Sequence, residues 1–141
     1  MTLTLAVLLH TSILAAGTDG YAQAHREAEQ GKPLVVLVST EWCTPCQTMK
    51  KTVIPEVRKR GLLAKVAFAI VDPDRDQGLA ERLTGGNPVV PQLIMYRKAP
   101  DGWKRTVLIG GQSVEGVEEF IKQGVARNEA VENAIVAVRH E

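Results

Sequence analysis

The chain has 141 residues, of which 45% are hydrophobic and 23% are charged, a balance typical of one globular domain. Its 17 Lys and Arg residues against 16 Asp and Glu give a net charge of +1, which excludes the strongly basic face of a nucleic-acid-binding protein. Two cysteines and three histidines without metal-ligand spacing argue against a closed zinc site, so we expect no bound metal.

Residues 1–17 form an apolar run that ends in Ala15, Ala16 and Gly17. A secretory signal has an apolar centre of this length before small residues, although no Lys or Arg precedes the run here. The alternative is an extra strand or helix at the start of the domain. We expect a targeting segment and a periplasmic or secreted location, with a cytoplasmic location as the alternative. The run is short for a bilayer span, so we expect membrane contact only through this segment.

The first half of the chain predicts helices and buried strands in alternation. Gly31 and Pro33 end a segment rich in helix formers, and an unbroken run of Leu and Val follows, typical of a strand covered on both faces. Pro55 is expected to kink or interrupt the helix that follows the cysteines. The expected elements are a helix over 20–30, a strand over 34–38, a helix over 44–51, a further turn over 56–60 and a strand over 66–71.

The second half predicts a short helix, a hairpin of two strands and a final helix capped by Ser113. We expect the final helix either to run on to Arg139 or to break near Asn128. The expected elements are a helix over 77–83, strands over 89–96 and 103–109, and a helix from 113 onward. The order predicts an α/β fold of three layers, a mixed sheet flanked by helices on both faces. We assign residues 18–127 to this domain and residues 128–141 to a C-terminal helical extension.

Cys43 and Cys46 lie where the first strand stops and a helix starts. A thiolate at Cys43 there faces unpaired N–H groups and the positive end of the helix, which stabilise the anion and make Cys43 the attacking thiol. Cys46 lies one turn further on, and we expect it to be more buried and protonated. Such a pair predicts thiol–disulfide exchange. The alternatives are a buried structural disulfide or half of a metal site.

The segment Trp42-Cys43-Thr44-Pro45-Cys46 resembles the active-site motif of the thioredoxin family, with Thr44 in place of the usual glycine. The resemblance covers most of the chain and implies a thioredoxin fold. The lead-in to the first strand is most similar to the secreted thioredoxin-like and disulfide-reductase-domain branches. The resemblance implies that the dithiol is the redox group and needs no cofactor. Trp42, Thr44 and Pro45 would then support Cys43 and Cys46, with Trp42 packed as a lid over them.

The family also places a cis-proline loop opposite the dithiol, and Val90-Pro91 matches that loop. A cis bond there would set the Val90 backbone beside the sulfurs, where its N–H and C=O could bind an extended substrate. Without the resemblance, an ordinary trans proline at a strand edge is the alternative.

Two positions depart from the family. Thioredoxins usually carry a buried aspartate and a lysine where this chain has Leu37 and Phe68. The carboxylate that accepts the proton of the second cysteine is therefore missing. Glu41 is the nearest carboxylate, but we interpret it as a solvated loop residue, and residues 72–76 as a solvated turn. Deprotonation of Cys46 would then rely on water, which predicts slow turnover as a general reductase or a restricted substrate.

We therefore expect an enzyme, a protein thiol–disulfide oxidoreductase that works as a reductase. Its partners would be protein disulfide or dithiol substrates and an upstream redox partner, with the chain itself a monomer. The alternatives are a disulfide oxidase or isomerase, a non-catalytic thioredoxin-like binding module, and a metallochaperone that holds a soft metal between two thiolates of a dimer.

Overall fold

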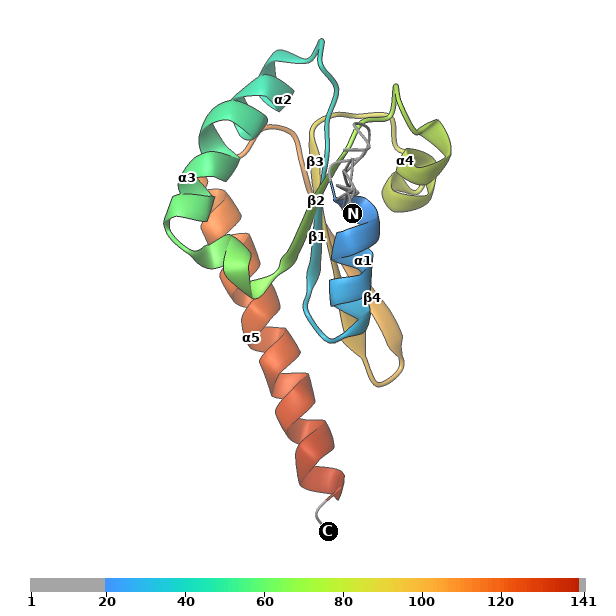
Figure 1. Cartoon of the computed structure of the whole chain (residues 1–141), viewed down its shortest axis with the longest axis vertical. Coiled ribbons are helices and arrows are strands. Elements are labelled where there is room, and N and C mark those ends of the chain that lie inside the picture. The colour runs from blue at the N-terminus through green and yellow to red at the C-terminus, as the bar shows by residue number, and fades with distance from the viewer. Residues whose placement is uncertain (1–19, 140–141) are drawn as a thin grey trace, which may run out of the picture.

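A four-stranded sheet in the order β2-β1-β3-β4 forms the middle layer of the fold (Figure 1). The computed structural model describes residues 20–139, so the predicted segment 1–17 lies outside the described part of the chain. β1 pairs in parallel with β2 and antiparallel with β3, and β3 forms an antiparallel hairpin with β4. The expected mixed sheet is confirmed. The strands are β1 (Leu34–Val38), β2 (Ala67–Val71), β3 (Gln92–Ala99) and β4 (Gly102–Ile109).

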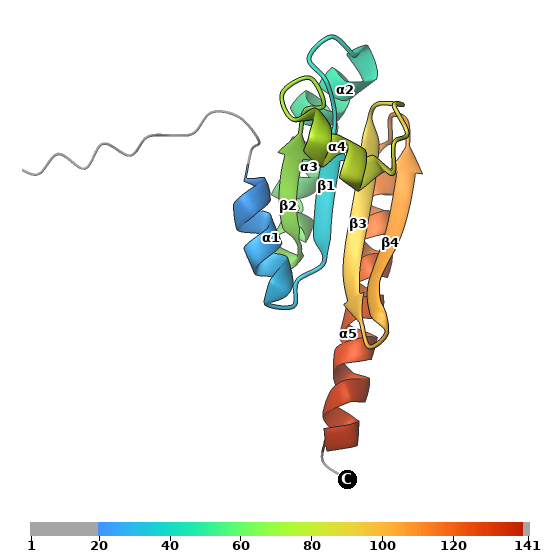
Figure 2. The same ribbon diagram turned by 90° about the vertical axis from the view of Figure 1, so that its right-hand side faces the viewer.

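Helices cover both faces of this sheet (Figure 2). Helices α1 (Tyr21–Glu29) and α4 (Gln77–Thr84) lie on one face. The other face carries α3 (Ile54–Lys59) and α5 (Val114–Arg139), with α2 (Thr44–Thr48) leading into α3 through the π-helical turn η1 (Met49–Val53). A short 3-10 helix, η2 (Leu62–Lys65), connects α3 to β2. The three expected layers are therefore confirmed.

The central strand β1 holds the two cores together because both of its faces are buried. Val35 and Leu37 pack into the core beneath α3 and α5, whereas Leu34, Val36 and Val38 pack into the core beneath α1 and α4. No residue of β1 is more than 3% exposed. This explains the unbroken apolar sequence, since alternate side chains of a strand point to opposite faces and here neither face meets water.

Two sequence predictions about element boundaries were wrong. Pro55 does not interrupt the helix after the cysteines, because η1 widens the turn and Pro55 then lies in the first turn of α3, where no N–H is needed. The third strand begins at Gln92 and not at residue 89. Pro91 has no N–H to donate to the ladder, so Val89 and Val90 belong to the preceding loop.

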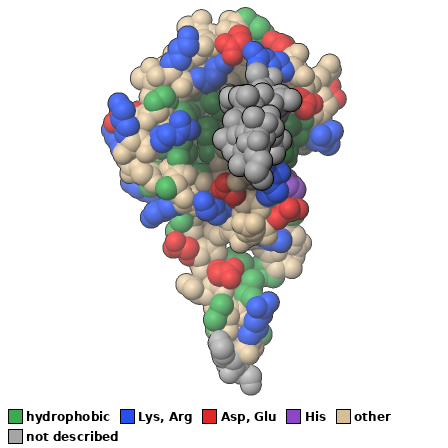
Figure 3. Space-filling model, viewed as in Figure 1, with side chains coloured by type: hydrophobic (Ala, Val, Ile, Leu, Met, Phe, Trp, Pro, Cys, Tyr) green, Lys and Arg blue, Asp and Glu red, His purple; other side chains and the backbone are tan. Residues whose placement is uncertain are grey.

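Helix α5 is one continuous helix of 26 residues, so of the two alternatives the run to Arg139 is confirmed, and the assigned boundary between residues 127 and 128 falls inside it. The Ser113 hydroxyl accepts the N–H of Gly116 at 3.0 Å, which confirms the expected cap. The C-terminal end of α5 extends beyond the body (Figure 3) and leaves Val138 74% exposed. Within residues 20–139, no helix is long and apolar enough to cross a membrane.

The packing of α5 on β3 gives a test of the fold. A Cβ added at Gly124 would collide with the thioether of the buried Met95, whereas one added at Gly78 in α4 would stay 3.7 Å from its nearest neighbour, Arg82 Nη1. We expect Gly124→Ala to lower the free energy of unfolding by about 1–3 kcal/mol relative to Gly78→Ala, because overpacking displaces the core. Urea denaturation measures both, and equal stabilities of the two variants would contradict this packing.

Candidate active site

Cys43 occupies the N-cap of α2, immediately after the loop that leaves β1. Its backbone is extended, with φ −91° and ψ 117°, and its Sγ accepts the N–H of Cys46 at 3.3 Å. The sulfur thus takes the place that a Ser or Asp side-chain oxygen takes in most caps. Pro45 stands in the first turn, where its missing N–H leaves no bond unmade. The predicted position of Cys43 at the helix N-terminus is confirmed.

The two cysteines are free thiols with different environments. Cys43 is 7% exposed and Cys46 is fully buried. Burial, and to a smaller extent a hydrogen bond with Cys43, raise the pKa of the Cys46 thiol to about 11. Cys46 therefore keeps its proton at neutral pH, as the sequence analysis expected. The accessible thiol is Cys43.

The Val90–Pro91 peptide bond is cis, in agreement with the expectation from the resemblance. The Val90 carbonyl lies 3.8 Å from Cys43 Sγ and accepts its S–H. Two further contacts fix this loop. The side chain of Gln92 donates to the carbonyls of Asn87 and Val89, at 3.0 and 2.7 Å, and the Pro91 carbonyl accepts the N–H of Gly110 at 2.8 Å.

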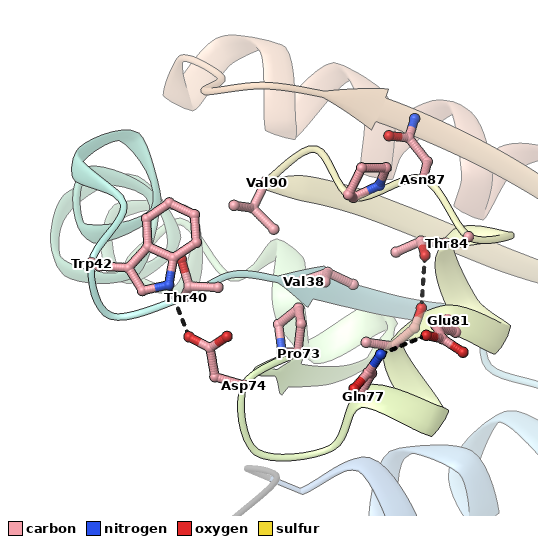
Figure 4. Close-up of a pocket in the computed structure, with 13 residues that line it drawn as sticks. Val38, Thr40, Trp42, Pro73, Asp74, Gln77, Glu81, Thr84, Asn87 and Val90 are labelled. Atoms are coloured by element: carbon pink, nitrogen blue, oxygen red, sulfur yellow. Dashed lines mark hydrogen bonds between the residues drawn. The ribbon is translucent and has the colours of Figure 1, made fainter.

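Trp42 is 72% exposed, so the expectation that it packs as a lid over the dithiol was wrong. A hydrogen bond holds the ring in place, because its Nε1 donates to Asp74 Oδ2 at 2.8 Å (Figure 4). Asp74 belongs to the turn after β2, where its own N–H donates to Asp72 Oδ1 at 2.9 Å. The turn interpreted as merely solvated therefore positions the residue before Cys43.

The remaining motif residues shape the helix around the dithiol. Thr44 is exposed, and its carbonyl accepts the Thr48 hydroxyl at 3.4 Å. Pro45 lies against Gly111, where an added Cβ would come within 3.5 Å of the proline Cβ. One residue further, the N–H of Gln112 donates to the thioether of Met49 at 3.3 Å. The loop after β4 is thus fitted closely to the start of the cysteine helix.

The buried charge pair usual in thioredoxins has no counterpart here. Leu37 is fully buried among apolar residues, and Phe68 packs partly buried against the same core. Glu41 is directed away to the surface, where Lys50 Nζ lies 2.7 Å from its Oε1, and the resulting hydrogen bond lowers the pKa of its carboxyl. The interpretation of Glu41 as a solvated loop residue is confirmed.

Thr40 is the site residue that the sequence analysis missed. It is 2% exposed, and its Oγ1 has no hydrogen-bond partner. Through its backbone N–H and its hydroxyl, Thr40 lowers the pKa of Cys46, against the dominant effect of burial. Gln47 fixes the residue by donating to the Thr40 carbonyl at 3.2 Å. In the sequence, the feature that could have indicated Thr40 was a hydroxyl residue that follows a wholly apolar strand and lies three positions before Cys43.

The fold and the paired thiols define a protein of thioredoxin architecture, and comparison with known proteins agrees. A family model described as thioredoxin-like matches residues 17–98, more than half of the chain. The chain belongs to the thioredoxin-like family. The comparison with curated proteins returned no match.

Solved structures of thioredoxins share the fold. A thioredoxin from Thermus thermophilus is 22% identical with a TM-score of 0.61, over 73% of this chain and 82% of that one. A thioredoxin from Trichomonas vaginalis is 23% identical with a TM-score of 0.58, over 72% and 87%. Chloroplastic thioredoxin z is 20% identical with a TM-score of 0.59, over 75% and 90%. At these identities the likeness establishes the thioredoxin fold alone.

The role of Thr40 can be tested by titrating Cys46 alone. In a Cys43→Ser background, we expect Thr40→Val to raise the pKa of Cys46 further, because the thiolate loses a hydroxyl that stabilises it. Thiolate absorbance in the ultraviolet measures the titration. Thr48→Val is the matched control, since Thr48 is exposed and its hydroxyl bonds the Thr44 carbonyl. An unchanged titration in Thr40→Val would contradict the assignment.

Proposed function

We propose that this protein is a thiol–disulfide oxidoreductase that reduces disulfide bonds in protein substrates. The observation that carries the proposal is the division between the two thiols. Cys43 caps the helix beside the Val90 carbonyl and is 7% exposed, whereas Cys46 lies fully buried behind it with its proton retained. An attacking thiol needs access, and a resolving thiol must stay unreactive until the mixed disulfide has formed.

The cycle uses only the two cysteines. The Cys43 thiolate attacks one sulfur of the substrate disulfide, forms a mixed disulfide and releases the other substrate sulfur as a thiolate, which takes up a proton. Cys46 then loses its proton and attacks Cys43 Sγ. The Cys43–Cys46 disulfide forms, and the substrate leaves with both of its cysteines reduced. A dithiol of an upstream redox partner returns the pair to the reduced state by the same exchange in reverse.

The contacts of Cys43 favour the reductase direction. Strong dithiol oxidants have a reduced form that is stabilised as a thiolate. Among the described residues, the hydrogen bonds to Cys43 Sγ are one N–H from Cys46 and the contact with the Val90 carbonyl, and no Lys, Arg or His donates to either sulfur. The reduced pair therefore lacks the stabilisation that makes an oxidant.

The loop at Val90 supports a protein substrate. Val90 lies outside the sheet and is half-buried, and its carbonyl faces the attacking sulfur. An extended substrate segment could pair with this backbone as an added strand, which would align a substrate disulfide with Cys43. The apolar residues 1–17 support a periplasmic or secreted location, with the cytoplasm as the alternative, and we expect the protein to act as a monomer.

Insulin reduction and trapping of the mixed disulfide test this proposal together. We expect the wild-type protein to accelerate reduction of insulin by dithiothreitol, and Cys46→Ser to accumulate a mixed disulfide with the insulin chain because nothing resolves it. Non-reducing electrophoresis and mass measure the adduct. Cys43→Ser is the control and should give neither acceleration nor adduct.

A wild-type protein no faster than Cys43→Ser would overturn the reductase proposal. If Cys46→Ser also formed no adduct with any protein disulfide, the non-catalytic binding module would take its place.

A further inference from the structure

A groove of about 470 Å³ lies on the α4 side of the dithiol (Figure 4). It runs from Trp42 across the turn after β2 and along α4 to the loop before Pro91. We name it the acidic groove after the charge of its lining. Its lining includes Thr40, Trp42, Asp74, Glu81, Asn87 and Val90.

The two carboxylates of the acidic groove have only neutral hydrogen-bond partners. Asp74 accepts from the indole of Trp42 at 2.8 Å, and Glu81 accepts from the amide of Gln77 at 2.9 Å. Among residues 20–139, no Lys, Arg or His lines the groove. Arg82, the nearest basic residue in sequence to Glu81, lines a separate pocket beneath α1. The negative charge of the groove is therefore not compensated by a cation among its own lining residues.

An unsatisfied polar atom lies in the same groove. Thr40 lines it, is 2% exposed and has an Oγ1 without a hydrogen-bond partner. Buried polar oxygens are rarely left unpaired, and an exception requires an explanation. The Thr40 hydroxyl can donate its hydrogen to the Cys46 thiolate, which leaves the oxygen to accept a hydrogen bond from a donor in the acidic groove. Both observations point to a ligand that carries N–H donors and positive charge.

The acidic groove is continuous with the reacting sulfur. Val90 lines the groove, and its carbonyl lies 3.8 Å from Cys43 Sγ. Trp42, at the other wall, precedes Cys43 in the chain. The side chains of an extended segment point to alternate sides. If a substrate segment is bound at Val90, a side chain next to the substrate's cysteine therefore points into the acidic groove.

We propose that the acidic groove binds a Lys or Arg side chain next to the cysteine of the protein substrate, and so selects substrates that are basic around their disulfide. This inference rests on the proposed function, because it concerns the substrate of the same two cysteines. It also gives a physical basis for a restricted substrate. Attraction between the groove and the substrate accelerates the encounter that precedes attack by Cys43.

Three synthetic peptide disulfides test the proposal with the reduced wild-type protein. The three peptides of a set share one sequence and differ in a single residue, which is Lys, norleucine or Glu. In one set this residue precedes the cysteine, and in a second set it follows the cysteine. We expect the second-order rate constant of mixed-disulfide formation to fall in the order Lys, norleucine, Glu. In at least one set, the Lys peptide should react about three- to tenfold faster than the norleucine peptide at low salt, and added salt should reduce this ratio.

Glu81→Gln should bring the ratio of Lys to norleucine rates close to one, because it removes a charge and retains the shape of the side chain. Glu119→Gln is the matched control. Like Glu81, Glu119 accepts from a Gln four residues away on its own helix, here Gln123 at 2.7 Å, but it lies on α5 away from the groove. If Glu81→Gln fails to fold, the salt dependence of the wild-type ratio still decides the question.

The outcomes separate the two proposals. Equal rates for the Lys, norleucine and Glu peptides, with the norleucine peptide reacting readily, overturn the inference and leave the oxidoreductase intact. Absence of reaction with all peptides overturns the proposed function itself, and the inference with it.

Discussion

The burial of Cys46 is the constraint on which the rest of the site depends. Its sulfur has no contact with water, and that burial keeps the thiol protonated. Cys43, one helical turn earlier, accepts the N–H of Cys46 and so lies against it, but it keeps 7% of its surface exposed. The contacts around the two cysteines maintain this difference in exposure, so that Cys43 is the accessible thiol and Cys46 stays buried and protonated.

The sheet brings together three loops that are distant in the sequence. The loops that leave β1 and β2 emerge at the same edge because these strands are parallel, and the loop that enters β3 lies there because β3 is antiparallel to β1. This edge therefore holds Cys43, Asp74 and Val90. The apolar strand β1, buried on both faces, gives them a rigid common support.

Local patterns were sufficient to predict much of this arrangement. The five residues of β1 were predicted without error, since a short Leu and Val run can hardly be anything but a buried strand, and the cysteine motif located the helix start. The cis bond at Val90 was predicted through the family resemblance, and no local pattern would have given it. The widened turn η1 was missed because it changes the helix without changing its apolar spacing.

Contacts made across the fold were beyond the reach of the sequence. Nothing near Trp42 indicates that its indole bonds Asp74, 32 residues later. The significance of Thr40 depends on complete burial beside Cys46, which a single hydroxyl residue in a sequence does not reveal. The departure at Leu37 was visible in the sequence, but the effect of Thr40 on the pKa of Cys46 depends on how the fold places the two residues.

The central claim is that the dithiol works as a reductant, and its reduction potential against glutathione tests this most directly. Because the thiolate of Cys43 has one N–H donor and no hydrogen bond from a cationic side chain among the described residues, the reduced pair should not be unusually stable. A potential close to that of thioredoxin, about −270 mV, is the predicted result. A value near −120 mV, typical of a strong dithiol oxidant, would contradict the account.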